Sequence, residues 1–215
     1  MKTLLLTAIL LIPLLNVNAQ EIGEMAPEKA PEVFPDNALG LDVMFSEGGF
    51  GLGGFYRRQF SDKVTGFVDL SISEAKDDRE IEYYDFYTNQ TYTVGKKNRV
   101  FLIPVNFGVQ YRLFESVIYD NLRPYLNAGV GPSMVITTPY REEFFKSFAY
   151  AQMKLAAGGY IGFGANFGLD KSSLVGINVR YYVIQFFDKG VESLTGHYNK
   201  TLGGFFLTIN IGMMY

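Results

Sequence analysis

The sequence of 215 residues contains no cysteine, no tryptophan and only one histidine. Without cysteine the chain cannot form disulfides, thiolate metal sites or an N-terminal lipid attachment. Its net charge of -3 offers no basic surface for phosphate, so we expect no nucleic-acid partner. Charged residues make up only 19%, below the usual quarter, and hydrophobic residues make up 48%. These values exclude a disordered chain and favour one domain with unusually apolar surfaces.

The chain also lacks an apolar run of the ~20 residues that a membrane-spanning helix needs. The run at residues 4–15 is shorter, follows Lys2 and is followed by the small residue Ala19. This order is typical of a secretory signal peptide, so we expect residues 1–19 to be removed on export. An anchor that stays in the membrane is the alternative. Residues 20–37 are acidic and contain three prolines spaced four apart, which predicts an extended periplasmic tail.

From residue 38 onward, apolar and small residues alternate, and a period of two predicts strands rather than helices. The clearest case is the C-terminal segment, in which every second residue from Phe205 to Tyr215 is apolar. Residues 80–94 could supply a ninth and a tenth strand, but their charges favour a hairpin that extends beyond a membrane. We therefore predict eight strands, roughly at residues 38–46, 50–60, 63–74, 101–111, 124–136, 153–168, 173–186 and 201–215.

Charge indicates which face of these strands points outward. A secreted lipocalin-like barrel would place the apolar face inside, whereas an outer-membrane barrel places it in lipid. The last three predicted strands comprise 45 residues and carry two charges, Lys154 and Arg180. A water-facing surface is typically ~25–35% charged, so lipid is the better match for the exterior. The charges gather instead in the connections, with ten of them at residues 74–97.

We therefore predict an all-β fold, an eight-stranded antiparallel transmembrane β-barrel over residues 38–215, with ten strands as the alternative. Connection lengths agree, because outer-membrane barrels have short periplasmic turns and longer exterior loops. The long connections that we expect outside lie at residues 75–98, 137–152 and 187–200.

Residues 38–215 resemble the small outer-membrane β-barrel family of OmpA/OmpX type. The resemblance rests on the signal peptide, the eight alternating strands and a last strand that ends on an aromatic, FFLTINIGMMY. Residues 123–132 (RPYLNAGVGP) look like the PY-x-x-AG-x-G strand of such barrels, and residues 102–113 look like the I-P…Y-R strand of PorT-like barrels. The resemblance implies outer-membrane lipid and the barrel-insertion machinery as partners. The machinery would read the last strand through Phe205, Ile211, Met213 and Tyr215.

The same alternation directs a set of polar side chains into the lumen. The charged members of this set are Asp42, Arg57, Asp69, Arg112 and Arg180. Buried charges must be paired, so we expect Asp42 and Asp69 to pair with Arg57 and Arg180 and to plug the lumen. A gated ion path is the functional interpretation. Packing inside a barrel that is just wide enough for its own side chains is the structural interpretation, and we favour it.

Other candidate chemistry is weak. His197 has Glu192 and Ser193 upstream in the same loop, but no serine lies two residues away, so we interpret it as an exposed loop histidine. We expect no catalytic residue, no metal site and no cofactor. The tyrosines of the 75–98 loop lie between charges, and tyrosine-rich loops on a rigid scaffold can recognise partners. The alternative is a hairpin whose aromatics pack on each other.

The sequence thus predicts a non-enzymatic integral protein of the bacterial outer membrane, reached after export through the inner membrane. Its lumen would be closed and polar, and its loops would serve envelope structure or binding of a protein partner, chiefly at residues 75–98 and 187–200. The alternatives are a barrel component of a secretion or transport machine and a small pore. A lipid A-modifying enzyme and a lipocalin-like carrier are less favoured.

Overall fold

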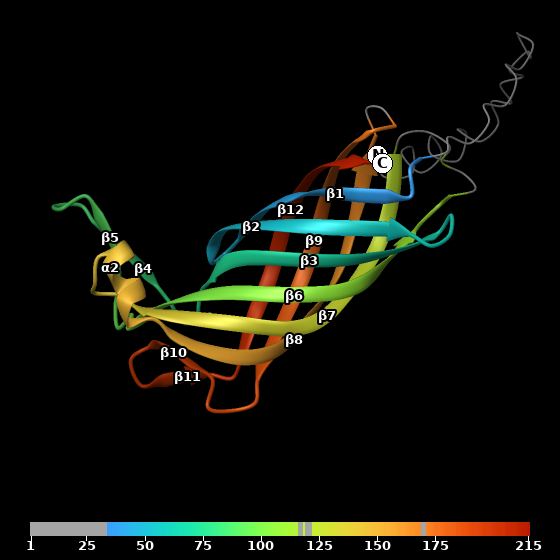
Figure 1. Ribbon diagram of the computed structural model, residues 1–215. Coiled ribbons are helices and arrows are strands. Elements are labelled where there is room, and N and C mark those ends of the chain that lie inside the picture. The colour runs from blue at the N-terminus through green and yellow to red at the C-terminus, as the bar shows by residue number, and fades with distance from the viewer. Residues whose placement is uncertain (1–33, 116–117, 119–121, 169–170) are drawn as a thin grey trace, which may run out of the picture. The chain divides into compact units, whose positions relative to one another are not determined.

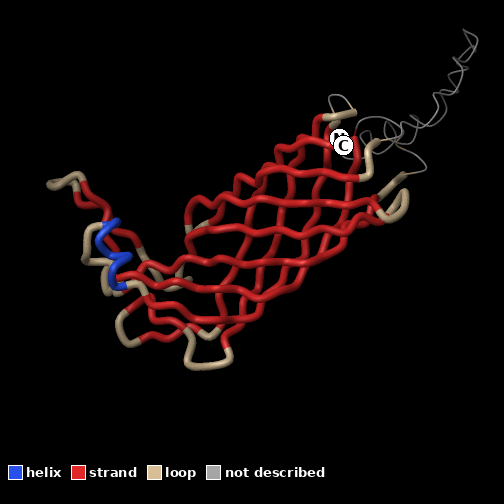
Figure 2. Tube along the Cα trace, in the orientation of Figure 1, coloured by secondary structure: helices blue, strands red, loops and turns tan. Residues whose placement is uncertain are grey.

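A computed structural model describes residues 34–115, 118, 122–168 and 171–215, all within one compact unit, Pro31–Tyr215. The predicted signal peptide and most of the predicted tail lie outside the described residues. Eight antiparallel strands close into a barrel, which confirms the predicted fold (Figures 1 and 2). The strands are β1 (Asn37–Ser46), β2 (Gly49–Gln59), β3 (Val64–Ala75), β6 (Asn98–Arg112), β7 (Leu122–Pro139), β8 (Gln152–Phe167), β9 (Ser173–Phe186) and β12 (Thr201–Met214).

The barrel closes where β1 pairs with β12. This seam runs in register from Ala38 opposite Met214 to Ser46 opposite Phe206. Just beyond it, Asn37 and Tyr215 exchange both backbone hydrogen bonds, with N to O distances of 3.2 and 2.9 Å. Neighbours in the sheet are otherwise neighbours along the chain, so each strand pairs with the strands before and after it. The eight strands of the barrel therefore leave no free sheet edge.

The smaller elements gather at one end of the barrel, opposite to the end where β1 begins and β12 finishes (Figure 1). The predicted 80–94 hairpin is present as β4 (Glu82–Asp85) and β5 (Gln90–Thr93), which form a separate sheet, so the ten-strand alternative is wrong. A second hairpin, β10 (Val191–Leu194) with β11 (His197–Asn199), was not predicted. Neither were the short helices α2 (Phe144–Ser147) and η2 (Phe148–Tyr150).

No helix among the residues that the structure describes is long and apolar enough to cross a membrane.

Burial alternates along the strands with polar side chains inside and apolar ones outside. On β9, Asn178 and Arg180 are buried, whereas Ile177 and Val179 between and beside them are exposed. This is the reverse of a water-soluble carrier, in which the apolar face lines the cavity. An apolar exterior belt follows the strands around the barrel, for example at Leu41, Leu52, Leu70, Phe107, Val109, Leu126, Val130, Ile161, Phe163, Leu207 and Ile211.

The lumen is filled by side chains, and apolar clusters lie at both of its ends beside buried polar side chains. A small apolar cluster closes the end near the seam's first residues, with Phe34, Ala38, Phe55, Leu174 and Met214. The opposite end is also apolar, with Ala75, Val100, Leu102, Val135, Ala156, Ile184, Phe186, Val191 and Leu202. The lumen is therefore polar only in part, because apolar clusters accompany buried polar residues such as Arg57 and Asn166 at one end and Thr138 at the other. Loop and tail residues such as Val191 and Phe34 enter the barrel there and need apolar partners.

Candidate functional site

An ion network occupies the middle of the lumen. Arg180 of β9 lies between two carboxylates, Asp42 of β1 and Asp69 of β3. The guanidinium nitrogens are 2.9 Å from the nearer Asp42 oxygen and 3.6 Å from the nearer Asp69 oxygen. All three side chains are almost fully buried, at 2% exposure for Arg180, 1% for Asp42 and 3% for Asp69. The structure thus brings together three of the five charged residues that the sequence directs inward.

Neutral side chains complete the hydrogen bonding of both carboxylates. Asn106 donates to one oxygen of Asp69 at 2.7 Å, and the hydroxyl of Tyr160 donates to the other at 2.9 Å. Asn210 donates to the oxygen of Asp42 that does not face Arg180. A buried ion pair is tolerated only when such additional bonds replace the lost water, and here they do so for the two carboxylates, whereas Nε of Arg180 is buried without a hydrogen-bond partner.

The two remaining charged residues of the predicted set lie elsewhere. Arg57 donates to the amide oxygen of Asn166 at 3.2 Å and, among the described residues, pairs with neither carboxylate. The register explains this difference from the expected pairing, because Arg57 lies opposite Ala38, four residues along β1 from Asp42. Four residues of strand correspond to ~13 Å. Arg112, near the same end of the barrel, donates to the backbone oxygen of Ile118 at 3.4 Å.

Aromatic rings pack beside the ion network. Tyr160 contacts Tyr182 with 4.7 Å between ring centroids and Phe67 with 6.0 Å, and Tyr182 contacts Phe206 at 5.2 Å. The Arg180 guanidinium lies 5.0 Å from the centroid of the Tyr160 ring. These rings and the ion network fill the middle of the barrel, in agreement with an interior packed by its own side chains.

The unpredicted hairpin β10–β11 covers the mouth of the barrel at the loop end. Val191 and Leu194 are buried, and Val191 joins the apolar cluster that includes Ile184 of β9 and Leu202 of β12. Gly190 and Gly196 flank the first hairpin strand with positive φ angles of 79° and 77°, a conformation that favours glycine. The hairpin therefore acts as a lid whose apolar underside fills the lumen.

Ion pairs fasten this lid to the surrounding strand ends. Lys97 lies 2.5 Å from Glu192, and the half-buried Lys96 lies 2.9 Å from Glu80, whose carboxylate also accepts a hydrogen bond from Ser193. The hydrogen bond from Lys97 lowers the pKa of Glu192 below its ordinary value. Because the charged forms bond to each other, the lid is held most firmly at neutral pH.

A second tie joins the lid to the segment after β3. Arg79 donates to Asp77 at 2.9 Å and to Asn199 of β11 at 2.6 Å, and Asn199 donates back to Asp77 at 2.5 Å. Burial acts to raise the pKa of Asp77, but the hydrogen bonds from Arg79 outweigh it and lower that pKa. The lid is thus connected to loops that lie more than 100 residues away in the chain.

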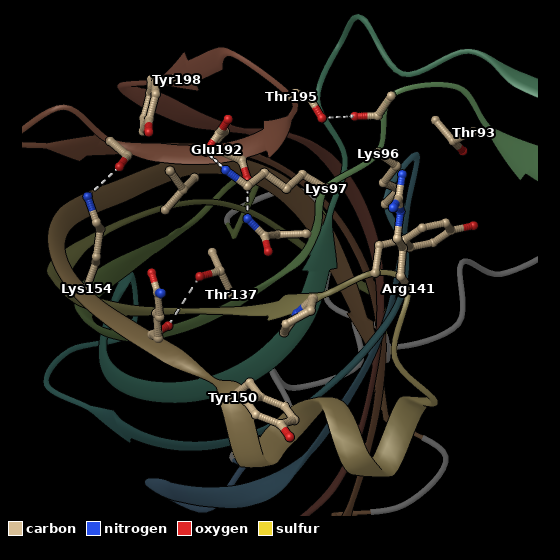
Figure 3. A pocket seen from close by; sticks show the side chains of 17 residues that line it. Thr93, Lys96, Lys97, Thr137, Arg141, Tyr150, Lys154, Glu192, Thr195 and Tyr198 are labelled. Carbon is tan, nitrogen blue, oxygen red and sulfur yellow. Dashed lines mark hydrogen bonds and ion pairs between the residues drawn. The ribbon is translucent and has the colours of Figure 1, made fainter.

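A cavity of about 890 Å³ opens between the lid and the loop after β7. Figure 3 shows its lining side chains, among them Tyr150 below the opening, Tyr198 above it and Arg141 to one side. Lys154, which also lines it, lies 2.7 Å from Asp188. The three lysines of the lining are paired with carboxylates, and hydroxyl, amide and aromatic side chains line the cavity beside them. Such a surface suits hydrogen bonding and ring contacts with a polar ligand.

The β4–β5 hairpin extends away from the barrel and carries exposed aromatics (Figures 1 and 2). Tyr83 stacks on Tyr92 with 5.9 Å between centroids, and Tyr84 contacts the Phe86 ring edge-on at 5.0 Å. These rings nevertheless remain exposed, and Tyr87 is 100% exposed. The aromatics thus pack on each other, as one interpretation of the sequence held, and still leave a large apolar surface.

The only histidine, His197, is not arranged with a serine and an acidic side chain as a catalytic site would require. His197 is exposed, and its Nδ1 lies 3.1 Å from the backbone oxygen of Thr195. The hydroxyl of Ser193 is buried and donates to Glu80, so the two side chains are engaged with different partners. The residues that the structure describes contain no group of three or more histidine, cysteine or acidic side chains placed to hold a metal ion.

Sequence reasoning missed the lid, although weak signals were present. Val191 and Ser193 lie two residues apart between Gly190 and Gly196, a spacing that fits a short strand with one buried face. The segment is only four residues long, and its apolar partners come from six different strands, so the contacts depend on the closed barrel.

The fold is that of the small outer-membrane β-barrels. No protein-family model matches the chain, and neither does any curated protein sequence. Among solved structures, Neisserial surface protein A is similar with a TM-score of 0.55 and 11% identity, over 86% of this chain and 100% of that chain. The N-terminal β-barrel domain of Pseudomonas aeruginosa OprF gives a TM-score of 0.47 and 12% identity, over 84% and 98% of the two chains.

Proposed function

We propose that the chain is a non-enzymatic integral outer-membrane protein whose lumen is closed and whose loops bind a partner outside the cell. The observation that carries this proposal is that one hairpin at the loop end is buried in the barrel mouth and the other is exposed. The β10–β11 lid fills the mouth with Val191, whereas the β4–β5 hairpin leaves Tyr87 and Phe86 fully or largely exposed. A closed lumen together with an exposed aromatic surface favours recognition over transport.

Position in the outer membrane is supported by the apolar belt and by the last strand. Phe205, Ile211, Met213 and Tyr215 all point outward, each more than half exposed. That face is available to lipid and to the machinery that inserts barrels. Membrane fractions run on gels with and without boiling test this position. A heat-dependent mobility shift is expected, and a soluble protein without a shift would overturn it.

The closed lumen has its own test. The purified protein in a planar lipid bilayer should give no steady conductance, because side chains fill the barrel from the Phe34 cluster to the Val191 cluster. Robust steady conductance of the unmodified protein would refute the closed lumen and favour a small pore.

The binding surface is tested by removing the exposed rings. Phe86→Ser with Tyr87→Ser should abolish retention of whatever protein co-purifies with the wild type, because aromatic anchors dominate most interfaces. Phe145→Ser is the matched control, since Phe145 is equally exposed at the same end of the barrel but on another loop. Retention that survives the double substitution and is lost in the control would move the binding surface away from the β4–β5 hairpin.

A further inference from the structure

The two short helices after β7 lie against the outer wall of the barrel. Val100 and Leu102 of β6 point into the apolar cluster of the lumen, so Phe101 between them points outward. Phe101 is nevertheless only 9% exposed. The rings of Phe144 and Phe148 cover it from outside, with 6.2 and 5.6 Å between ring centroids.

We call residues 144–150, which comprise α2 and η2, the aromatic segment. Ser147 lies on the same side of the helix as Phe144 and is fully buried, whereas Phe145 is 79% exposed. Phe144 and Phe148 themselves remain 44% and 42% exposed although they pack on the wall. The aromatic segment therefore presents a contiguous apolar surface that the described residues leave uncovered.

Polar contacts fix the start of the aromatic segment to the same wall. Arg99 has the same outward direction as Phe101, two residues further along β6. It donates to the backbone oxygens of Pro139 and Glu142 at 3.1 and 3.3 Å. Its guanidinium also lies 5.8 Å from the centroid of the Phe144 ring. The position of the aromatic segment on the wall is thus held by both polar and apolar contacts.

The aromatic segment continues the apolar exterior belt of the barrel. Phe101 pairs with Ile136 of β7, and Ile136 pairs with Met153 of β8, so these side chains form one row on the outer wall. Met153 and Leu155 are 66% and 77% exposed. They connect the aromatic segment with the belt further along β8, where Ile161 is also exposed.

The height of the aromatic segment on the barrel matches a membrane boundary. Phe101 lies ten residues from Tyr111, an exposed aromatic near the other end of β6. Ten residues of antiparallel strand measure ~34 Å, and a tilt of ~40° reduces this to ~26 Å along the membrane normal. The apolar band of outer-membrane barrels is ~25 Å tall and has aromatic rings at both boundaries. Phe101 and the rings that cover it therefore lie at the boundary nearer to the loops.

We propose that the aromatic segment inserts into the outer leaflet and anchors the loop after β7 at the boundary between lipid headgroups and acyl chains. The inference rests on the proposed position in the outer membrane. The exposed charges of residues 141–143 then lie among the headgroups, as in helices that lie in a membrane interface. The loop after β7 is thereby withdrawn from the surface that a partner outside the cell could bind, and the β4–β5 hairpin remains.

A single introduced tryptophan tests the proposal, because the chain contains none of its own. Phe145→Trp is placed at the most exposed ring of the aromatic segment. The folded full chain is reconstituted into phosphatidylcholine vesicles whose acyl chains are brominated near the carbonyl end or, in a second set, near the methyl end. Phe145→Trp should lose about half of its fluorescence in the first set and much less in the second, because interfacial side chains lie ~5–10 Å deep.

Two matched variants calibrate the depth. Phe107→Trp lies on the apolar belt between Phe101 and Tyr111 and should be quenched more by bromine near the methyl end. Tyr87→Trp lies on the β4–β5 hairpin and should be quenched by iodide in the water and by neither lipid. The heat-dependent mobility shift verifies that each variant is folded. Phe148→Trp, in the same segment and with the same expected quenching, replaces Phe145→Trp if that variant does not fold.

The outcomes separate this inference from the proposed function. If Phe107→Trp is quenched by lipid and Phe145→Trp behaves like Tyr87→Trp, the lipid anchor is overturned and the membrane position stands. If Phe107→Trp is also quenched by iodide alone, the membrane position fails and the anchor fails with it. If Phe145→Trp is shielded from both iodide and bromine, protein covers the aromatic segment, either a second copy or a partner, and the lipid anchor is again overturned.

Discussion

Removal of the Arg180 guanidinium should destabilise the barrel more than most single substitutions. In Arg180→Met the carboxylates of Asp42 and Asp69 stay buried at 1% and 3% exposure, and both lose their cation. At an effective dielectric constant of about 20, pairs separated by 2.9 and 3.6 Å are each worth about 5 kcal/mol before desolvation is subtracted. Breaking a buried pair typically costs ~3–5 kcal/mol, and we expect a loss in that range.

The assay is urea unfolding of the protein in lipid vesicles, followed by tyrosine fluorescence or by the fraction that keeps its heat-dependent gel mobility. A triple variant, Arg180→Met with Asp42→Asn and Asp69→Asn, should regain most of the lost free energy because no unpaired charge remains. A loss below ~1 kcal/mol for Arg180→Met would refute the reasoning, because it would mean that water reaches the middle of the lumen.

Three further outcomes follow from the loops and one strand. Val191→Glu should lift the lid, since it places a charge in the apolar cluster beneath the lid, and should produce channel events in planar bilayers that the wild type lacks. Because the hydrogen bond from Lys97 lowers the pKa of Glu192, its stabilisation is complete above the ordinary value of 4.5 and is lost as pH falls below it. Hydrogen exchange in the lid, corrected for intrinsic rates, should then rise between pH 6 and pH 3.5, and Glu192→Gln should abolish that rise. Gly203→Ala should lower the unfolding free energy by more than ~1 kcal/mol, because φ is +150° and the new Cβ would lie 2.0 Å from a backbone oxygen, whereas Gly54→Ala, with 3.7 Å, should be tolerated.

The barrel strands could be predicted to within a few residues because their period of two is enforced along every segment. One face of each strand meets lipid and the other meets a narrow lumen, so each position suits only one kind of side chain. The alternation along the strand is therefore enough to assign Asp42, Asp69 and Arg180 to the interior. The alternation of inward and outward positions does not show which of the inward charges form ion pairs. Arg57 and Arg180 have the same inward parity, but their registers place them at different heights in the barrel, so only Arg180 reaches Asp42.

The lid and the apolar clusters at the ends of the lumen could not be predicted for a different reason. Val191 belongs to a segment of four residues and is buried by side chains from six other strands, such as Val100 and Val135. The sequence around Val191 does not identify those partners, because they come together only when the sheet has closed. The same holds for Phe34, which the sequence assigned to an extended tail and which the structure places in a buried cluster.

The position of the ion network has a consequence for how the barrel assembles. Asp42 lies on β1 and Arg180 on β9, so their contact crosses β12 and with it the junction of the first and last barrel strands. Their sequence separation of 138 residues makes this one of the most non-local contacts in the molecule, and it can form only after the cylinder has closed. Before closure Asp42 and Arg180 are separate charges that must stay hydrated. Closure of the barrel removes that water and forms the ion pair in the same step. The ion pair therefore stabilises the closed barrel and not an open sheet.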